Sequence, residues 1–237
     1  MSERRPAPRK RDRDVLDALG EMIEGRLKRG REKLGALIAE VRREGSAGDA
    51  EEFLGYLKAF LADPGVAAIA PSSRYLVART LKALSLENAK VVVEYGAARG
   101  VLTRRLLRDL APDARLVAVE FNREFYEHFS SRLRDPRLIP VHGDVTRIDE
   151  ILAGLGIARA DRVVSGIPFS FLSEAGRREL LAKTAALLTP GGRFVATYQI
   201  TGHLIPLLKD YFGSVDIQYE VRNIPPCFVF TGTKTPR

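Results

Sequence analysis

The residues best suited to chemistry lie between positions 90 and 120, where an acid and several small residues follow one apolar run and a second acid ends the next. The first group alternates along the chain: Glu94, Gly96, Ala98 and Gly100. Glycine lets the backbone adopt conformations closed to other residues and lets a ligand approach the main chain. Glu120, roughly 20 residues further on, can accept two hydrogen bonds from a ribose diol. This spacing predicts a site for a nucleotide-containing cofactor.

Two strands and a helix must position these residues. An apolar strand leads into the turn, the turn opens a helix from position 101, and a second strand over 115–120 ends on the acid. This order is that of a nucleotide-binding βαβ unit, in which the ligand lies outside the carboxyl ends of the strands.

The spacing of the turn differs from the Gly-x-Gly-x-x-Gly of dinucleotide-binding proteins. It resembles the first motif of the class I S-adenosylmethionine-dependent methyltransferases, in which an acid precedes three alternating glycines. This chain departs from the motif at Ala98, which adds one methyl group to the turn. The resemblance implies S-adenosylmethionine as the cofactor and Glu94, Gly96, Ala98, Gly100 and Glu120 as residues that bind it.

Beyond Pro71, strand-like apolar runs alternate with amphipathic, helix-like runs. Strands are expected near 90–95, 115–120, 137–142, 161–166, 193–199, 214–221 and 227–233. Helices are expected near 74–85, 101–110, 122–133, 146–155, 174–188 and 202–211. The connection 222–226 is too short for a crossover helix, so the last two strands should be antiparallel neighbours. The prediction is a Rossmann-like α/β fold: a seven-stranded, mostly parallel sheet with one antiparallel strand and helices on both faces.

Residues 1–45 are expected to form a basic amphipathic extension, and residues 46–237 the methyltransferase domain. Apolar side chains recur at helical spacing in the extension: Val15, Leu16, Leu19, Met22, Ile23, Leu27, Leu34, Leu37, Ile38 and Val41. The lysines and arginines between them suit anionic head groups, as in a helix that lies in a membrane interface. The alternative is that this apolar face packs on the protein's own core.

Composition limits the possible functions. The formal charge of +8 and the pI near 9.8 favour an anionic partner, but charge alone does not separate nucleic acid from a lipid surface. The lone Cys227 excludes an internal disulfide, and the three histidines fit no ligand spacing, so no metal is expected. No apolar run reaches the roughly 18 to 20 residues of a membrane span, and the basic start lacks a signal-peptide core. We therefore expect a cytoplasmic protein.

Further residues near strand ends extend the expected cofactor site. In the resembling family an acid after the third strand bonds the adenine amino group, which implies this role for Asp144, and Gly143 beside it is assigned to the same cofactor site. Asp144 also precedes a helix and could be its N-cap, and the two roles are compatible. Phe121, after the second strand, and Ser165, at the end of the fourth, are assigned to the same site. The Thr-Pro-Gly-Gly segment 189–192 resembles the family's turn before the fifth strand, with an architectural role.

The residues after the fourth strand bear on the substrate. Nucleic-acid amino methyltransferases place Asn or Asp here, a proline two residues later and then an aromatic; the corresponding catalytic positions are Gly166, Pro168 and Phe169. Without a side-chain acceptor at Gly166, a flipped adenine would lose one of its orienting hydrogen bonds. A small aliphatic amine needs no in-plane acceptor and could use backbone carbonyls.

Three segments resemble a narrower family, the bacterial phospholipid N-methyltransferases, which are relatives of the rRNA adenine dimethylases. They are Ser-Gly-Ile-Pro-Phe-Ser at 165–170 and the stretches 60–74 and 221–229, and the likeness covers about residues 53–235. It implies successive methylation of phosphatidylethanolamine towards phosphatidylcholine, with peripheral attachment to the inner, anionic face of the membrane. RNA adenine N6-methylation and a non-catalytic cofactor-binding protein are the alternatives, with nucleic acid the less favoured partner.

Polar residues in the two outer segments suit a lipid head group. Four could hold its phosphate: Ser72, Ser73, Arg74 and Arg222. The serines could instead cap the following helix. Transfer to an amine requires the amine in its neutral form, and no residue stands out as a strong general base. Tyr75 is assigned as a catalytic candidate beside Tyr198 and His203, with packing or surface exposure as the alternative for each.

Overall fold

The computed structural model describes residues 72–167, 169, 172–198, 204–223 and 226–235. The extension expected over 1–45, the boundary at residue 46 and the catalytic candidate Pro168 lie outside these residues, as does His203.

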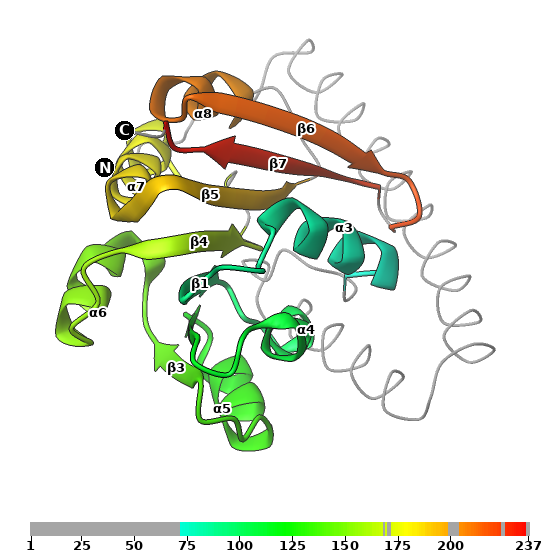
Figure 1. The fold of residues 1–237 in the computed structure, drawn as a ribbon, viewed down its shortest axis with the longest axis vertical. Coiled ribbons are helices and arrows are strands. Elements are labelled where there is room, and N and C mark those ends of the chain that lie inside the picture. The colour runs from blue at the N-terminus through cyan, green and yellow to red at the C-terminus, as the bar shows by residue number, and fades with distance from the viewer. Residues whose placement is uncertain (1–71, 168, 170–171, 199–203, 224–225, 236–237) are drawn as a thin grey trace, which may run out of the picture. The chain divides into compact units, whose positions relative to one another are not determined.

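Strands and helices alternate through most of the described chain (Figure 1). The strands are β1 (Val91–Tyr95), β2 (Arg115–Glu120), β3 (Leu138–His142), β4 (Ala160–Ser165), β5 (Leu188–Tyr198), β6 (Ser214–Glu220) and β7 (Cys227–Thr233). The α-helices are α3 (Arg74–Leu84), α4 (Val101–Asp109), α5 (Arg123–Arg132), α6 (Ile148–Gly154), α7 (Glu174–Leu187) and α8 (Leu204–Tyr211), and the 3-10 turn η1 (Val145–Arg147) precedes α6. Polar side chains fix three helix starts, because Ser73, Asn122 and Ser173 each accept a hydrogen bond from a backbone N–H of the first turn.

The strands form one sheet in the order β3-β2-β1-β4-β5-β7-β6. Pairing is parallel from β3 to β5 and antiparallel between β5 and β7 and between β7 and β6. β7 is therefore the one reversed strand, next to the edge. The predicted seven-stranded, mostly parallel sheet and its antiparallel final pair are confirmed.

Alternate residues of the central strands enter two separate cores. Val93 and Tyr95 of β1 pack with residues of α6, α7 and α8, whereas Val92 packs with residues of α3, α4 and α5. This division follows from the two-residue period of a strand, and it places three helices on each face of the sheet. Apolar side chains fill both faces, as a mostly parallel sheet requires.

The register brings the carboxyl ends of six strands, all but β7, to one edge of the sheet. Tyr95 of β1 pairs with Val119 of β2 and Ser165 of β4, and Ser165 pairs with Ala196 of β5. Because β7 runs in the opposite direction, its first residues lie at this same edge, with Phe228 opposite Tyr198. We call it the carboxyl edge. It carries the turn after β1 (residues 96–100), the end of β4 and the connection from β6 to β7. We call the turn the cofactor turn, because the sequence predicts the cofactor there.

The predicted elements agree with the observed ones to within about two residues, except at β5. This strand begins at Leu188, not near 193, so the Thr-Pro-Gly-Gly segment expected as a turn lies within it. The segment is irregular: the register shifts between Ala160 and Arg162 of β4, and Gly191 has a φ of 72°. Gly191 N donates to Lys234 O, and Lys234 N donates to Gly192 O. These two bonds hold the segment to the residue after β7.

We predict that Gly232→Ala destabilises the fold. A Cβ at this position of β7 would lie 2.6 Å from Cγ of Phe212, a buried ring stacked on Phe194. Overpacking of this kind lowers the free energy of unfolding by about 1 to 3 kcal/mol. Gly154→Ala is the matched control, because nothing lies within 4 Å of its Cβ position. Urea denaturation measures both, and equal losses in the two variants would contradict the packing argument.

Candidate active site

The turn after β1 is held in an unusual backbone conformation. Gly96, Ala98 and Gly100 have φ values of 77°, 49° and 83°, all in the left-handed region. Glycine adopts this region without strain, whereas Ala98 does so at an energetic cost because of its Cβ. The backbone N–H of Ala98 donates to Oε2 of Glu120 over 2.7 Å, which stabilises the strained residue. All three positions of the motif are thus left-handed, although only Gly96 and Gly100 are glycines.

The two glycines are also required by packing against the protein itself. A Cβ on Gly96 would lie 2.9 Å from Cγ2 of Ile167, and one on Gly100 would lie 3.0 Å from the side chains of Phe129 and Leu133. The expectation that these glycines let a ligand approach the main chain stays a prediction. The space that their Cβ atoms would fill belongs to the segment after β4 and to α5.

Glu120 joins the two halves of the expected cofactor site. Its Oε2 accepts the hydrogen bond from Ala98. Its Oε1 accepts one from the backbone N–H of Asn122, the residue before α5, over 2.8 Å. Its carboxyl is buried, and burial raises the pKa of Glu120 although these backbone hydrogen bonds oppose the rise. A carboxylate has about four acceptor positions, so both oxygens keep one for a ligand hydroxyl. The geometry fits a ribose diol, and the assignment of Glu120 to the cofactor stays a prediction.

Glu94 is the most deeply buried acid of the motif, with 1% of its surface exposed. Thr103 Oγ1 of α4 donates to its Oε2 over 2.7 Å. Burial raises the pKa of Glu94 to about 8, with a further contribution from the nearby charge of Glu120. In this structure Glu94 anchors the first helix after the turn.

The residues after β2 and β3 meet through backbone and ring contacts. Gly143 N donates to Glu120 O over 3.0 Å, and His142 Nε2 lies 3.0 Å from Phe121 O. Phe121 is 74% exposed, so its ring is accessible for stacking. Asp144 is exposed, and its Oδ1 accepts from Thr146 N, as the N-cap alternative requires. Binding of adenine by Phe121, Gly143 and Asp144 stays a prediction.

The three described residues assigned to the end of β4 lie in different surroundings. Gly166 is exposed and directly beside the cofactor turn, because its N–H donates to Tyr95 O over 2.9 Å. The Oγ of Ser165 is buried and has no hydrogen-bond partner among the described residues. Phe169 is 1% exposed, and its ring packs edge to face on Phe194. In this structure the Phe169 ring is part of the hydrophobic core, and its catalytic assignment stays a prediction.

The residues expected to bind the head group lie in a second polar cluster at the carboxyl edge. Ser73 N donates to Asn223 Oδ1 over 2.9 Å, which holds the start of α3 against the connection between β6 and β7. Arg74 Nη2 donates to the hydroxyl of Tyr75 over 2.8 Å, and Arg222 lies over the Tyr75 ring at 4.1 Å. The structure thus brings Tyr75, Ser73, Arg74 and Arg222 together. Ser72 is exposed and adjoins them in sequence.

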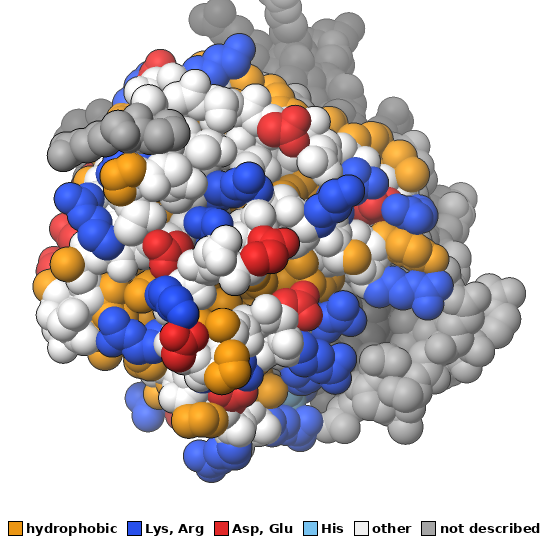
Figure 2. Space-filling view, viewed as in Figure 1, with side chains coloured by type: hydrophobic (Ala, Val, Ile, Leu, Met, Phe, Trp, Pro, Cys, Tyr) orange, Lys and Arg blue, Asp and Glu red, His pale blue; other side chains and the backbone are white. Residues whose placement is uncertain are grey.

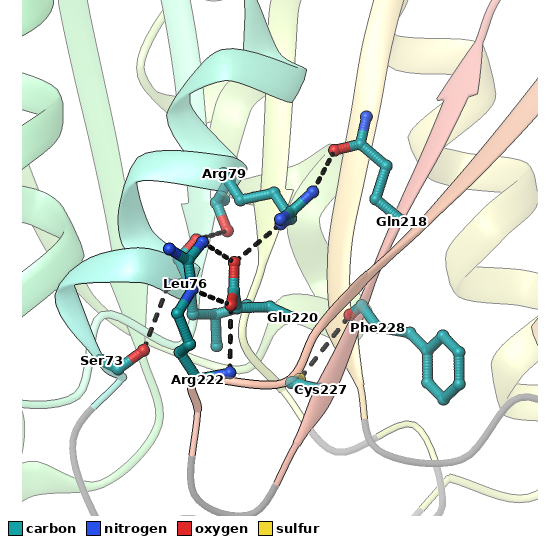
Figure 3. A network of polar contacts seen from close by, with 9 residues as sticks. Ser73, Leu76, Arg79, Gln218, Glu220, Arg222, Cys227 and Phe228 are labelled. Carbon is teal, nitrogen blue, oxygen red and sulfur yellow. Dashed lines mark hydrogen bonds and ion pairs between the residues drawn. The ribbon is translucent and has the colours of Figure 1, made fainter.

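Two members of this cluster were missed by sequence reasoning. Glu220 accepts from both Arg79 and Arg222 (Figure 3). Arg79 had no signal beyond its place on an amphipathic helix. Glu220 ends an apolar-polar alternating strand, as Glu120 ends its strand, and that position was the available signal.

Basic side chains are widespread, so positive charge does not by itself mark the site. Figure 2 shows many of them over α4 and α5, with acids between them. A groove near the last turns of these helices is lined by Arg104, Arg108, Arg132, Arg134 and Arg137. Arg137 donates to Leu107 O and Leu110 O, which are carbonyls at the end of α4. These cations complement helix C-termini and lie towards the opposite edge of the sheet.

Comparison with known proteins identifies the class. Residues 92–192 match a family model described as a methyltransferase domain. The chain is 34% identical over 178 residues to an ornithine lipid N-methyltransferase from Singulisphaera acidiphila, which covers 73% of this chain and 90% of that protein. It is also 34% identical over 98 residues to a ribosomal RNA small subunit methyltransferase A from Thermosynechococcus vestitus, covering 41% of this chain and 34% of that protein.

A solved structure shares the fold. The 1,6-didemethyltoxoflavin-N1-methyltransferase from Burkholderia thailandensis, with 1,6-didemethyltoxoflavin and S-adenosylhomocysteine bound, has a TM-score of 0.59 at 21% identity and covers 77% of this chain and 87% of that one. With the sheet order and the cofactor turn, these matches show that the chain belongs to the class I S-adenosylmethionine-dependent methyltransferases. It is an S-adenosylmethionine-dependent N-methyltransferase. The cofactor supplies a sulfonium methyl group for transfer to nitrogen.

We predict that Ala98→Gly stabilises the protein. The substitution removes the strain of the left-handed conformation, which raises the free energy of unfolding. The greater freedom of glycine in the unfolded chain offsets part of this gain, so the net rise should be about 0.5 to 1 kcal/mol. Affinity for S-adenosylhomocysteine should be unchanged or higher by calorimetric titration. The buried neighbour Ala97, which has no positive φ, is the control, since Ala97→Gly should lower stability. Equal losses in both variants would show that Ala98 is not strained.

Glu94 should make stability depend on pH. In the folded protein the carboxyl stays protonated up to about pH 8, whereas in the unfolded chain it ionises near its ordinary pKa of 4.5. The contribution of Glu94 to the free energy of unfolding is therefore fully present below pH 4.5. It is lost as pH rises towards 8, by up to roughly 1 kcal/mol per pH unit. Glu94→Gln cannot ionise, so its stability relative to wild type should increase across this window. Urea denaturation from pH 5 to 8 measures it, with exposed Glu127→Gln as control; parallel profiles of Glu94→Gln and wild type would refute the prediction.

Proposed function

We propose that this enzyme methylates the primary amine in the head group of a membrane lipid, with phosphatidylethanolamine and an ornithine lipid as the candidate substrates. The match to an ornithine lipid N-methyltransferase over 90% of that protein's length supports a lipid amine. The segments that resemble phospholipid N-methyltransferases support phosphatidylethanolamine, with further methylation towards phosphatidylcholine. Both lipids carry an amine a few bonds from an anionic group.

The observation that carries this proposal is Gly166. It lies at the carboxyl edge beside the cofactor turn, and the nearest atom to a Cβ built there is Gly96 O at 3.6 Å. A side chain would fit, yet the chain offers none, so no side-chain acceptor at this position orients the plane of a nucleobase. Backbone carbonyls can accept from an aliphatic amine in many orientations. An aliphatic amine is therefore the better nucleophile for this site.

Transfer requires the amine nitrogen to approach the methyl group from the side opposite the sulfur. Alignment of these atoms supplies much of the rate enhancement, and the amine must lose its proton before it attacks. Tyr75 is one of the catalytic candidates among the described residues, although its hydroxyl accepts from Arg74 and its ring is covered by Arg222. We propose that binding beside Gly166 and Ile167 removes the ammonium from water, which lowers its pKa.

The enzyme would reach its substrate at a membrane surface. No helix in the described part of the chain is long and apolar enough to cross a bilayer. We propose peripheral attachment to the anionic inner face, with the extension 1–45 as the attachment segment.

An RNA substrate is the second candidate, because part of the chain matches a ribosomal RNA methyltransferase. That match covers 34% of the relative, and the missing acceptor at Gly166 opposes it. The lipid relative is matched over most of its length and is the stronger support.

Transfer of radiolabelled methyl groups from S-adenosylmethionine separates the two candidates. The wild type should label vesicles containing phosphatidylethanolamine or ornithine lipid at least tenfold faster than small-subunit ribosomal RNA. Glu120→Ala should bind S-adenosylhomocysteine more weakly, by about 1.5 to 3 kcal/mol, and label every substrate more slowly. Preferential labelling of RNA, or no labelling of either lipid, would overturn the proposed function.

A further inference from the structure

The carboxylate of Glu220 is an unusual feature of the carboxyl edge outside the cofactor turn. It ends β6 with 1% of its surface exposed, and both its oxygens are fully used. Oε1 accepts from the backbone N–H and the Nε of Arg222 over 3.0 and 2.8 Å, and Oε2 accepts from Arg79 Nε and Arg222 Nη2 over 2.9 and 3.0 Å (Figure 3). The guanidinium of Arg222, more than any other group, holds the pKa of Glu220 down to about 2, so the carboxyl is ionised.

These contacts fix the guanidinium of Arg222 on two sides. Its Nε and Nη2 face Glu220, and its plane lies 4.1 Å from the centroid of the Tyr75 ring. Its Nη1 makes no hydrogen bond to any described residue, and 54% of the side chain is exposed. One edge of the planar fork is therefore anchored on Glu220, while Nη1 and the second hydrogen of Nη2 remain to bind a ligand. A guanidinium presented in this way suits a carboxylate or a phosphate, which it can bind through two hydrogen bonds.

The surroundings of Arg222 favour an anion. Arg79 and Arg222 both bind the buried Glu220 carboxylate. Arg74 lies in the same cluster, with its Cζ 4.8 Å from the centroid of the Tyr75 ring. Asp216 is the next acid along this face of β6, where it accepts from Gln218, which in turn accepts from Arg79. The first turn of α3 contains no acid that could compete for Arg222.

Position along the sheet relates this cluster to the point of transfer. The connection that carries Arg222 joins β6 to β7 at the carboxyl edge, and these strands are three and two positions from β4, which ends next to Gly166. At 4.7–4.9 Å per strand, the separation in the sheet is about 10 to 15 Å. A head group whose amine and anion are separated by a few bonds, together with the length of the arginine side chain, can span this separation.

We propose that Arg222 binds the anionic group of the substrate's head group, and that buried Glu220 is a positioning residue that aims the guanidinium at it. The ligand chemistry is an oxyanion, either the phosphate of a phospholipid or the carboxylate of an amino-acid lipid. This inference rests on the proposed function, since it assigns one end of the same substrate. Bound there, the anion fixes one end of the head group and directs the amine towards Gly166. An amine without a neighbouring anion loses this alignment.

The test compares steady-state kinetics on lipids with and without the anion. The substrates are phosphatidylethanolamine, ornithine lipid and a long-chain primary alkylamine, each in phosphatidylcholine vesicles. Arg222→Lys keeps a charge but lacks the fork, and should raise KM about tenfold or more for at least one of the two lipids whose head group contains an anion. Its kinetics on the alkylamine should equal those of wild type. Arg105→Lys, an exposed arginine on α4, is the matched control and should change none of these constants.

Glu220 needs a readout that a purely structural role would not change. Glu220→Gln should raise KM for the same lipid as Arg222→Lys does, with little change in kcat. Its kinetic constants on the alkylamine should equal those of wild type. Glu220→Asp keeps the charge and should restore part of the affinity. Thermal denaturation of each variant monitors folding, and a loss of activity on all three substrates in proportion to lost stability would overturn the positioning role.

The remaining outcomes are also decisive. A rise in KM confined to phosphatidylethanolamine or to ornithine lipid supports the inference and identifies the anion as phosphate or carboxylate. Unchanged KM for both lipids in Arg222→Lys overturns it while the proposed function stands. Inhibition of wild type by inorganic phosphate, with lipid KM unchanged in the variant, also overturns it in favour of a free-anion site. If the wild type methylates no lipid amine, the proposed function fails first and the inference falls with it.

Discussion

The hydrogen bonds of the Glu120 carboxylate determine the shape of the cofactor site. One oxygen holds the backbone of Ala98 in its left-handed conformation, and the other holds the residue from which α5 begins. A single side chain at the end of β2 thus fixes both the turn after β1 and the first helix after β2. The register of β1 and β2 places the carboxylate between them, so the site depends on correct parallel pairing of these two strands.

The reversed direction of β7 determines which residues meet at the carboxyl edge. In a fully parallel sheet this strand would begin at the opposite edge, and the residues before it would lie far from β4. Antiparallel pairing with β5 instead places Arg222 and Asn223 beside the start of α3. The cofactor turn then occupies one part of the edge and the arginine cluster another, with Gly166 between them in strand order. Ser73 and Asn223, which are separated by 150 residues, are thereby brought into contact at the carboxyl edge.

Local patterns were sufficient to predict most of the fold, whereas long-range pairing was not. The apolar runs that became β1, β2 and β4 are buried on both faces and are bounded by turn residues, so their periodicity and length identified them. β5 was placed too late because proline and two glycines normally end a strand, and tertiary contacts with β4 and β7 overrode that local signal. The packing of Phe169 on Phe194 is not predictable for a similar reason, since the motif around Phe169 does not reveal which ring lies beside it. The pairing of Glu220 with Arg79 joins residues 141 positions apart, and no local pattern encodes it.

The single cysteine provides a native reporter of motion at this corner of the protein. Cys227 is buried at the first position of β7, directly opposite Glu220 in the register, and its Sγ contacts Phe228 O. Because a buried thiol reacts only when it becomes accessible, the rate at which a thiol reagent labels the native enzyme measures how often the β6–β7 connection opens. No label needs to be engineered and no second thiol interferes. The opening of the arginine cluster can thus be timed in the unmodified chain, with and without lipid present.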